Sequence, residues 1–163
     1  MENLCVYPGS FDPITVGHLD LIRRAAALFP RVVVAVLNNP DKKGAFTFEE
    51  RAEMIREACR DIPNVTVDSF SGLLVDYMRS INARIVIRGL RTVSDFESEF
   101  QMAQVNRQLS DFSVETIFLT TSPEYGSISS SIVRQVAMFG GDISALVPDA
   151  ICSRVSQRLN KQS

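Results

Sequence analysis

The sequence predicts an α/β fold built on a five-stranded, doubly wound parallel sheet with helices on both faces. Short apolar runs rich in β-branched residues alternate with segments of helical periodicity along the chain. Several of these runs are almost continuously apolar, which is typical of strands buried on both faces of a parallel sheet. Short connections between strands and helices also favour right-handed crossovers. We expect the 163 residues, 1–163, to form a single domain that is helical from about residue 130.

The composition is that of a globular protein, with 45% hydrophobic and 22% charged residues. The formal net charge of −2 argues against nucleic acid as a partner, because nucleic-acid binders carry a basic excess. The sequence shows neither a secretory leader nor an apolar stretch of about 18 residues, so we expect a cytoplasmic protein with no membrane partner. Three separated cysteines and a single histidine do not form a metal-binding pattern.

Five strands are predicted from the apolar runs. In chain order they are Leu4–Tyr7, Val32–Leu37, Val65–Phe70, Arg84–Ile87 and Thr116–Leu119. Two helices between them are indicated by apolar residues that share one face. These residues are Leu19, Ile22, Ala26 and Phe29 on the first helix, and Phe48, Ala52, Ile55 and Cys59 on the second.

Capping patterns mark where two helices begin. Thr47 with Glu50 predicts a capping box at the start of the second helix. Ser94 with Glu97 predicts another at the start of a later helix. The apolar residues of that later helix are Phe96, Phe100 and Ala103. After the fifth strand only helical patterns follow, at Ser130–Met138 and Ile151–Asn160.

The segment YPGSFDPITVGH, Tyr7–His18, follows the first predicted strand directly. Ligands bind beyond the carboxyl ends of parallel strands, so a functional loop is expected here. Gly9 allows close approach to the backbone, and Ser10 offers a hydroxyl. Thr15 can cap the next helix, whose N-terminus attracts anions, and His18 lies on the same face. We interpret the segment as a phosphate site, in preference to a helix cap followed by a core histidine.

Three further candidates also follow predicted strands. The segment IRGLR places Arg88 and Arg91 where two guanidinium groups could clamp a polyphosphate. Lys42, in the loop Asn38–Ala45, could neutralise phosphate. The segment Gly126–Ser131 offers hydroxyls and free N–H groups to an anion. Alone, each could be an ordinary surface feature; together they favour a nucleotide site. No Walker-type P-loop, GxGxxG or GxSxG motif supports a P-loop kinase, a standard dinucleotide enzyme or a serine hydrolase.

The sequence resembles the bacterial phosphopantetheine adenylyltransferases, a branch of the nucleotidyltransferase superfamily with the HxGH signature. The segment Thr15–His18, TVGH, fits the TxGH variant of this branch, whereas cytidylyltransferases of the superfamily typically keep both histidines. The likeness spans nearly the whole chain. It rests on YPGSFDP, the pair Lys42 and Lys43, FTFEER at Phe46–Arg51, IRGLR, DFESEFQMAQVNR at Asp95–Arg107 and ISSS at Ile128–Ser131.

The resemblance implies a Rossmann-like nucleotidyltransferase domain that transfers AMP from ATP to 4′-phosphopantetheine in coenzyme A biosynthesis. The products would be dephospho-coenzyme A and pyrophosphate. It also implies a homohexamer, and Mg²⁺ that accompanies ATP without protein side chains as ligands. The attacking phosphate is already anionic at neutral pH, so catalysis requires positioning and charge stabilisation rather than a general base.

The resemblance also assigns roles by position in the matching motifs. His18 would stabilise the transition state, aided by Lys42 and Arg91. Residues expected to contact ATP are Ser10, Phe11, His18, Gly89, Leu90, Arg91, Glu99, Tyr125, Gly126, Ser127, Ile128, Ser129, Ser130 and Ser131. Residues expected to hold phosphopantetheine are Ser10, Lys42, Leu74 and Arg88. Ser10 stands where the family often has Thr, and Tyr125 where it can have Trp.

Two other interpretations stay open. One is another nucleotidyltransferase of the superfamily that acts on a different phosphorylated acceptor, such as nicotinamide mononucleotide or glycerol phosphate. The apolar pair Leu73 and Leu74 favours a pantetheine arm instead, because such an arm needs an apolar groove. The other is a non-catalytic nucleotide-binding domain, since a fold alone does not fix a function. The presence of both His18 and Lys42 argues against it.

Overall fold

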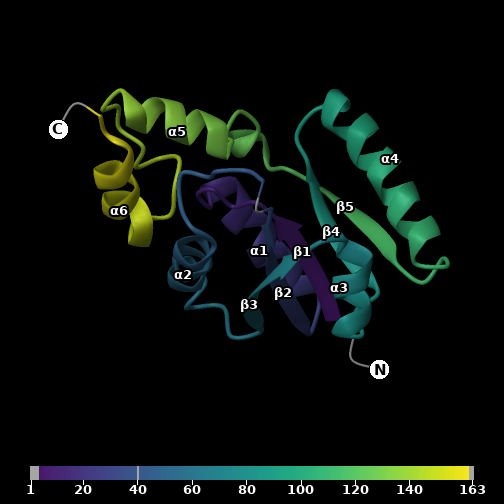
Figure 1. Ribbon diagram of the computed structural model, residues 1–163. Helices are drawn as coiled ribbons and strands as arrows, with labels where there is room; N and C mark the ends of the chain where they lie inside the picture. The colour runs from purple at the N-terminus through teal and green to yellow at the C-terminus, as the bar shows by residue number, and fades with distance from the viewer. Residues whose placement is uncertain (1–3, 40, 162–163) are drawn as a thin grey trace.

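One parallel sheet forms the centre of the computed structural model, which describes residues 4–39 and 41–161 (Figure 1). Its strand order is β3-β2-β1-β4-β5, so the order reverses beside β1, between its neighbours β2 and β4. This is the predicted five-stranded, doubly wound arrangement, and its switch point is where such sheets bind ligands. The strands are β1 (Leu4–Gly9), β2 (Arg31–Asn38), β3 (Val65–Ser71), β4 (Ile85–Leu90) and β5 (Glu115–Thr120). Residue 40 of the predicted loop 38–45 lies outside the described residues.

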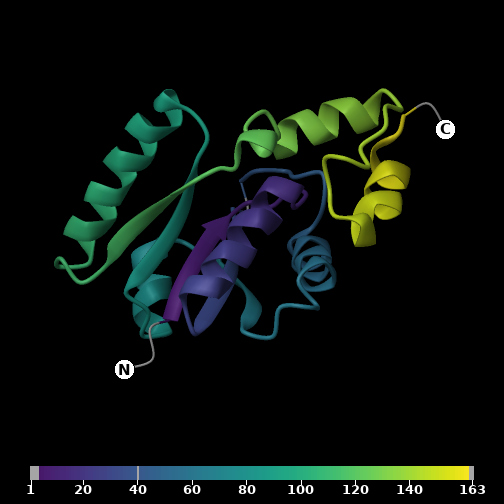
Figure 2. The same cartoon turned by 180° about the vertical axis from the view of Figure 1, so that it is seen from behind.

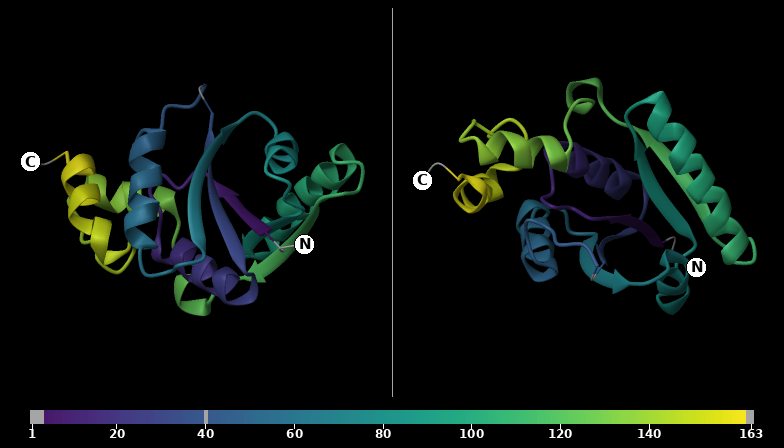
Figure 3. Two further views of the ribbon diagram at one scale, coloured as in Figure 1. Left: turned by 90° about the horizontal axis from the view of Figure 1, so that it is seen from below. Right: turned by 45° about the horizontal axis from the view of Figure 1, so that its top comes forward.

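Helices cover both faces of the sheet, as predicted (Figures 2 and 3). On one face, α1, α2, α5 and α6 pack into a large apolar cluster, while α3 packs into a smaller cluster on the other face. On β1, Cys5 and Tyr7 belong to the large cluster and Val6 to the small one, the period-two alternation of a strand buried on both faces. The helices are α1 (Val16–Leu28), α2 (Phe48–Ala58), α3 (Leu74–Ser80), α4 (Val93–Leu109), α5 (Ser130–Met138) and α6 (Asp149–Leu159), with a 3₁₀ turn η1 (Pro123–Tyr125).

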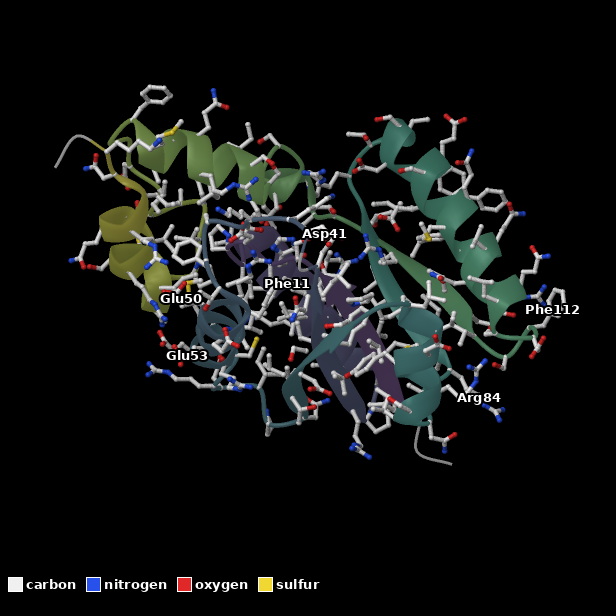
Figure 4. The ribbon with its side chains drawn as sticks, in the orientation of Figure 1. Phe11, Asp41, Glu50, Glu53, Arg84 and Phe112 are labelled. Atoms are coloured by element: carbon white, nitrogen blue, oxygen red, sulfur yellow. The ribbon has the colours of Figure 1, made fainter. Side chains whose placement is uncertain are left out.

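The C-terminal helix α6 closes the large cluster against α2. Ile151 and Val155 are fully buried there. Around them, Arg154 and Arg158 form ion pairs with Glu53 and Glu50 of α2, at 2.9 and 3.1 Å (Figure 4 labels the two glutamates). Those pairs are largely exposed, so burial of the apolar side chains holds α6 in place more than the charges do.

Two predicted strand ends are wrong, and both errors concern the candidate site. β1 continues through Gly9, which pairs with Val36, and β4 continues through Leu90, which pairs with Thr120. Arg88 and its neighbour Gly89 therefore lie within β4 rather than after it. Pairing with β2 in the first case and with β5 in the second outweighs the weak strand propensity of glycine and proline.

Two helix predictions also need correction. The predicted capping box of Ser94 and Glu97 is wrong, because Thr92 is the N-cap of α4 and its hydroxyl accepts from the Asp95 N–H at 3.2 Å. The sequence patterns above do not predict α3, which has only seven residues and no side-chain cap. By contrast, the capping box of Thr47 and Glu50 is confirmed at the start of α2. None of the described helices is long and apolar enough to cross a membrane.

Candidate active site

A cavity of about 530 Å³ opens at the carboxyl ends of β1 and β4, where the strand order reverses. Its volume lies in the range of roughly 300–1,000 Å³ that is usual for small-molecule sites. Thirteen of the predicted site residues line it, from four separate segments of the chain. They are Ser10, Phe11, His18, Lys42, Arg88, Gly89, Arg91, Glu99, Tyr125, Ile128, Ser129, Ser130 and Ser131. The structure therefore brings the four candidate segments together around one cavity.

His18 is held by a reciprocal cap at the start of α1. The Thr15 hydroxyl accepts from the backbone N–H of His18 at 3.2 Å, and Nδ1 of His18 accepts from the backbone N–H of Thr15 at 3.0 Å. Thr15 is buried, with 1% of its surface exposed, so both bonds are shielded from water. The histidine takes the place that Glu or Gln fills in an ordinary capping box. From the sequence, a helix cap and a ligand-binding histidine were alternatives. In the structure, His18 both completes the cap and lines the cavity.

This cap fixes the proton on the His18 ring. A backbone N–H can only donate, so Nδ1 must be the acceptor and Nε2 carries the hydrogen. Burial of the ring, aided by the charges of Arg88 and Arg91, lowers the pKa of His18 from 6.5 to about 4. At neutral pH the ring is therefore uncharged, with one N–H left for a ligand in the cavity.

Phe11 shapes the loop that leads into this helix. Its backbone has φ of 47°, a left-handed conformation that is uncommon outside glycine and clusters at functional sites. Its ring contacts His18 edge-on, with centroids 5.0 Å apart, near the middle of the molecule (Figure 4). A Cβ on Gly9 would come within 3.1 Å of this ring. Gly9 thus makes room for Phe11, and it also lines the cavity, so close approach of a ligand to its backbone stays a prediction.

Gly89 has a similar packing role. A Cβ there would collide with the side chain of Leu21, so the missing side chain lets α1 pack closely on β4. Its neighbour Arg88 is bound in a fork by Glu99, with Nε–Oε2 and Nη2–Oε1 distances of 2.8 and 2.6 Å. Nη1 of Arg88 also donates to the carbonyl of Pro8 at 2.6 Å. Three of the five guanidinium N–H groups are thus engaged, which leaves two for a ligand.

Arg91 connects the end of β4 to the loop before α5. Its Nε donates to the Asp95 carboxylate and its Nη1 to the carbonyl of Ile128, both at 3.3 Å. Arg91 therefore has a carboxylate partner, as Arg88 does. Both arginines of the IRGLR segment are held in place before any ligand arrives.

The serine segment uses its hydroxyls differently from the prediction. The Ser129 hydroxyl caps α5 by accepting from Ile132 N–H at 3.2 Å, and the Ser130 hydroxyl donates to the carbonyl of Pro13 at 2.7 Å. The Ser131 hydroxyl accepts from Arg134 at 3.3 Å. What α5 offers the cavity is chiefly the N–H groups of its first turn, which have no acceptor within the helix.

Four predicted residues are not among those that line the cavity. Leu74 begins α3 and packs against the small apolar cluster, beside Leu37, which does line the cavity. The Leu90 carbonyl accepts from Thr121 in the β4–β5 ladder. Gly126 ends the 3₁₀ turn, and Ser127 lies exposed in the turn that follows. Their proposed substrate contacts stay predictions.

Sequence reasoning missed three buried or half-buried groups beside the cavity. Asp12 and Arg51 are 7% and 5% exposed, and the two form an ion pair at 3.3 Å. Arg134 donates to the carbonyl of Asp12 at 2.6 Å. No local pattern predicts these contacts because the partners are far apart in sequence. The sequence did contain one indication of a buried charge, because Arg51 falls on the apolar face of a predicted helix.

The carboxylates that line the cavity already have partners. Among the residues that the structure describes, no group of three His, Cys, Asp or Glu side chains is arranged to hold a metal ion. Asp12, Asp95 and Glu99 line the cavity, but their carboxylates are bound to arginines or backbone N–H groups.

Known proteins with similar sequences are phosphopantetheine adenylyltransferases. The sequence model of the cytidylyltransferase-like family matches residues 6–136. The phosphopantetheine adenylyltransferase of Caldanaerobacter subterraneus is 54% identical over 97% of this chain and 98% of its own. That of Clostridium tetani is 54% identical over 98% and 99%, and that of Nostoc punctiforme 53% identical over 98% and 87%.

A solved structure supports the fold independently. A Vibrio parahaemolyticus protein provisionally named as a nicotinate-nucleotide adenylyltransferase superposes with a TM-score of 0.71. The superposition covers 95% of this chain and 99% of the other, at 16% identity. At that identity the likeness concerns the fold alone.

The His18 ring gives a direct test of this geometry, because it is the single histidine of the chain. Its ring NMR signals should show no titration between pH 8 and 5.5, since its pKa lies at about 4. Lowering the pH from 6.5 towards 4 should destabilise the fold, because the unfolded chain binds the proton more readily over that range.

The variant His18→Gln provides the control, since glutamine can fill the capping-box position without titrating. Denaturation measured across this pH range should show a steeper loss of stability in the parent than in the variant. Parallel curves, or a ring that titrates near 6.5, would contradict the buried neutral ring.

Proposed function

Because the chain belongs to the phosphopantetheine adenylyltransferases, enzymes of coenzyme A biosynthesis, we propose that its cavity transfers AMP from ATP to 4′-phosphopantetheine. The products are dephospho-coenzyme A and pyrophosphate. The observation that carries the proposal is the His18 Nε2–H, fixed by the cap on α1 in a cavity that Arg88, Arg91 and Lys42 also line.

The chemistry is an in-line displacement at the α-phosphorus of ATP. An oxygen of the phosphopantetheine phosphate forms the new P–O bond while the bond to pyrophosphate breaks, so no proton has to be removed from the nucleophile. His18 acts as a neutral donor to an α-phosphoryl oxygen, and the Lys42 ammonium stabilises the same developing charge. With a pKa of about 4 the ring is uncharged at neutral pH, and the cap on Nδ1 keeps its one hydrogen on Nε2.

The arginines and α5 bind the remaining phosphates. Arg88 holds the acceptor phosphate through the two N–H groups that Glu99 and Pro8 leave unused. Arg91 and the N–H groups at the start of α5 hold the departing pyrophosphate. Glu99 therefore acts mainly by orienting Arg88, in addition to its expected place near ATP.

Three further expectations belong to this proposal. Mg²⁺ enters with ATP as part of the substrate and shields its phosphates, without a protein ligand set. Residues 1–163 act as one domain, and the protein works in the cytoplasm. ATP and 4′-phosphopantetheine are its partners, rather than nucleic acid or membrane.

The protein further assembles as a homohexamer. Helix α4 exposes six large apolar side chains on two sides of the helix, although a monomer rarely exposes so much apolar surface on one element. Its side chains that are between 45% and 88% exposed are Val93, Phe96, Phe100, Met102, Val105 and Leu109. Contact with other copies of the chain would bury these side chains.

The reaction can be tested with purified protein, ATP and Mg²⁺. Adding 4′-phosphopantetheine should release pyrophosphate, whereas nicotinamide mononucleotide or glycerol phosphate should leave the rate at background. Release with one of the other acceptors alone would assign a different reaction, and release with none would leave a non-catalytic nucleotide-binding domain.

Substitution of His18 separates its two roles. His18→Ala should lower kcat by about 10²–10³-fold, the usual effect of losing one transition-state donor, with a smaller change in KM for ATP. It should also cost about 1 kcal/mol of stability through the lost cap. His18→Gln should recover much of that stability while its kcat stays low. Equal losses in ATP binding and in kcat for His18→Ala would instead indicate a role in ground-state binding.

The assembly can be tested on α4. Met102→Glu should reduce the mass in light scattering from that of six 18.1 kDa chains to that of a smaller species. Leu28→Glu is the matched control, because Leu28 is 65% exposed and lies on α1 rather than α4. A hexamer that persists in Met102→Glu, or a parent that is monomeric, would contradict the assembly proposed through α4.

A further inference from the structure

The Asp12 carboxylate connects two loops of the cavity wall. We name residues 9–13 the anion loop and residues 41–46 the lysine loop, after Lys42. Oδ2 of Asp12 accepts from the Ala45 N–H and Oδ1 from the Phe46 N–H, both at 2.9 Å. Asp12 is 7% exposed, so its two charge-assisted bonds lie out of water, where such bonds are strongest.

Arg51 makes the return connection. It lies on the first turns of α2, directly after the lysine loop, and is 5% exposed. Its Nη1 donates to the carbonyl of Ser10 in the anion loop at 3.2 Å, and its Nε donates to the carbonyl of Phe46 at 2.9 Å. Nε also lies 3.3 Å from Oδ1 of Asp12. Each loop thus holds the other through a buried charge.

The lysine loop is built to close over this pair. A Cβ on Gly44 would overlap the Arg51 guanidinium and lie 2.9 Å from Oδ2 of Asp12. Lys42 lies just before this point, and its side chain is exposed at the cavity. The Asp12–Arg51 pair therefore anchors the lysine loop three residues after Lys42, whose own N–H donates to the carbonyl of Asn39.

We propose that Arg51 and Asp12 are positioning residues that hold Lys42 at its working distance from the reacting phosphates. A buried ion pair adds little net stability compared with apolar side chains of the same size, so stability alone does not account for it. Positioning does, because a lysine on an exposed loop loses much of its effect when its anchor moves. This inference rests on the role of Lys42 in the proposed function.

The test is a double-mutant cycle in the full chain, read as kcat/KM for pyrophosphate release. Arg51→Lys keeps the charge but cannot reach the Ser10 and Phe46 carbonyls with a planar fork. It should lower kcat/KM at least about tenfold in the parent, yet less than about twofold in the Lys42→Ala background, where no lysine remains to be positioned. A role in folding alone would give the same loss in both backgrounds and would overturn the proposal.

Gly44→Ala serves as the second variant, in case Arg51→Lys is poorly folded. It displaces Arg51 while it retains every charge, and should show the same dependence on Lys42. Arg154→Lys is the matched control, because Arg154 of α6 pairs with Glu53 on the outer side of α2 and should leave kcat/KM unchanged. If Arg51→Lys and Gly44→Ala both retain parental kcat/KM, the proposal is also overturned.

The same measurements distinguish a failure of the proposed function from a failure of the positioning role. If the parent releases no pyrophosphate from ATP and 4′-phosphopantetheine, the proposed reaction is contradicted. If the Lys42→Ala variant reacts at the parental rate, the proposed role of Lys42 is contradicted. An active parent with an impaired Lys42→Ala upholds both roles. Additive losses for Arg51→Lys would then reject the positioning role alone.

Discussion

The reciprocal cap between Thr15 and His18 is the constraint on which the rest of the site depends. It begins α1 at the end of the anion loop, and it holds the imidazole with Nδ1 towards the backbone. The same contact therefore decides the start of a helix, the tautomer of a ring and the direction of its remaining donor. A glutamate in place of His18 could complete the capping box equally well, but it would not place a donor in the cavity.

Around this ring the cavity is lined with charges whose geometry is already fixed. Its arginines are bonded to carboxylates, whereas no ion pair joins Lys42 to any residue in the described part of the chain. Such preorganised groups stabilise developing charge without reorganising during the reaction. The lysine is the exception, since its side chain stays free to follow the phosphate. The bonded arginines and carboxylates are Arg88 with Glu99, Arg91 with Asp95, and Arg51 and Arg134 with Asp12.

The sequence predicts where ligand-bearing loops lie better than it predicts how they are held. Parallel strands buried on both faces leave a strong apolar signal, so the four candidate segments could be placed at one edge of the sheet. Gly9 and Gly89 suggested loops, yet strand pairing continues through both, because hydrogen bonds to one neighbouring strand in each case outweigh local propensity. The contacts of Asp12 and Arg51 leave no local pattern, since each partner lies on another segment. Helix α3 escaped because it is short and lacks a side-chain cap.

The properties of the site agree with a reaction that moves a phosphoryl group rather than a proton. Burial lowers the pKa of His18 to about 4, which makes the ring a weak base at neutral pH. The donor role does not depend on this shift, because the bond to Nδ1 keeps the hydrogen on Nε2. Burying Asp12 and Arg51 likewise contributes little to net stability but restricts where the lysine loop can lie. The fold thus uses desolvated groups to fix geometry, and geometry is what an in-line displacement with an already ionised nucleophile requires.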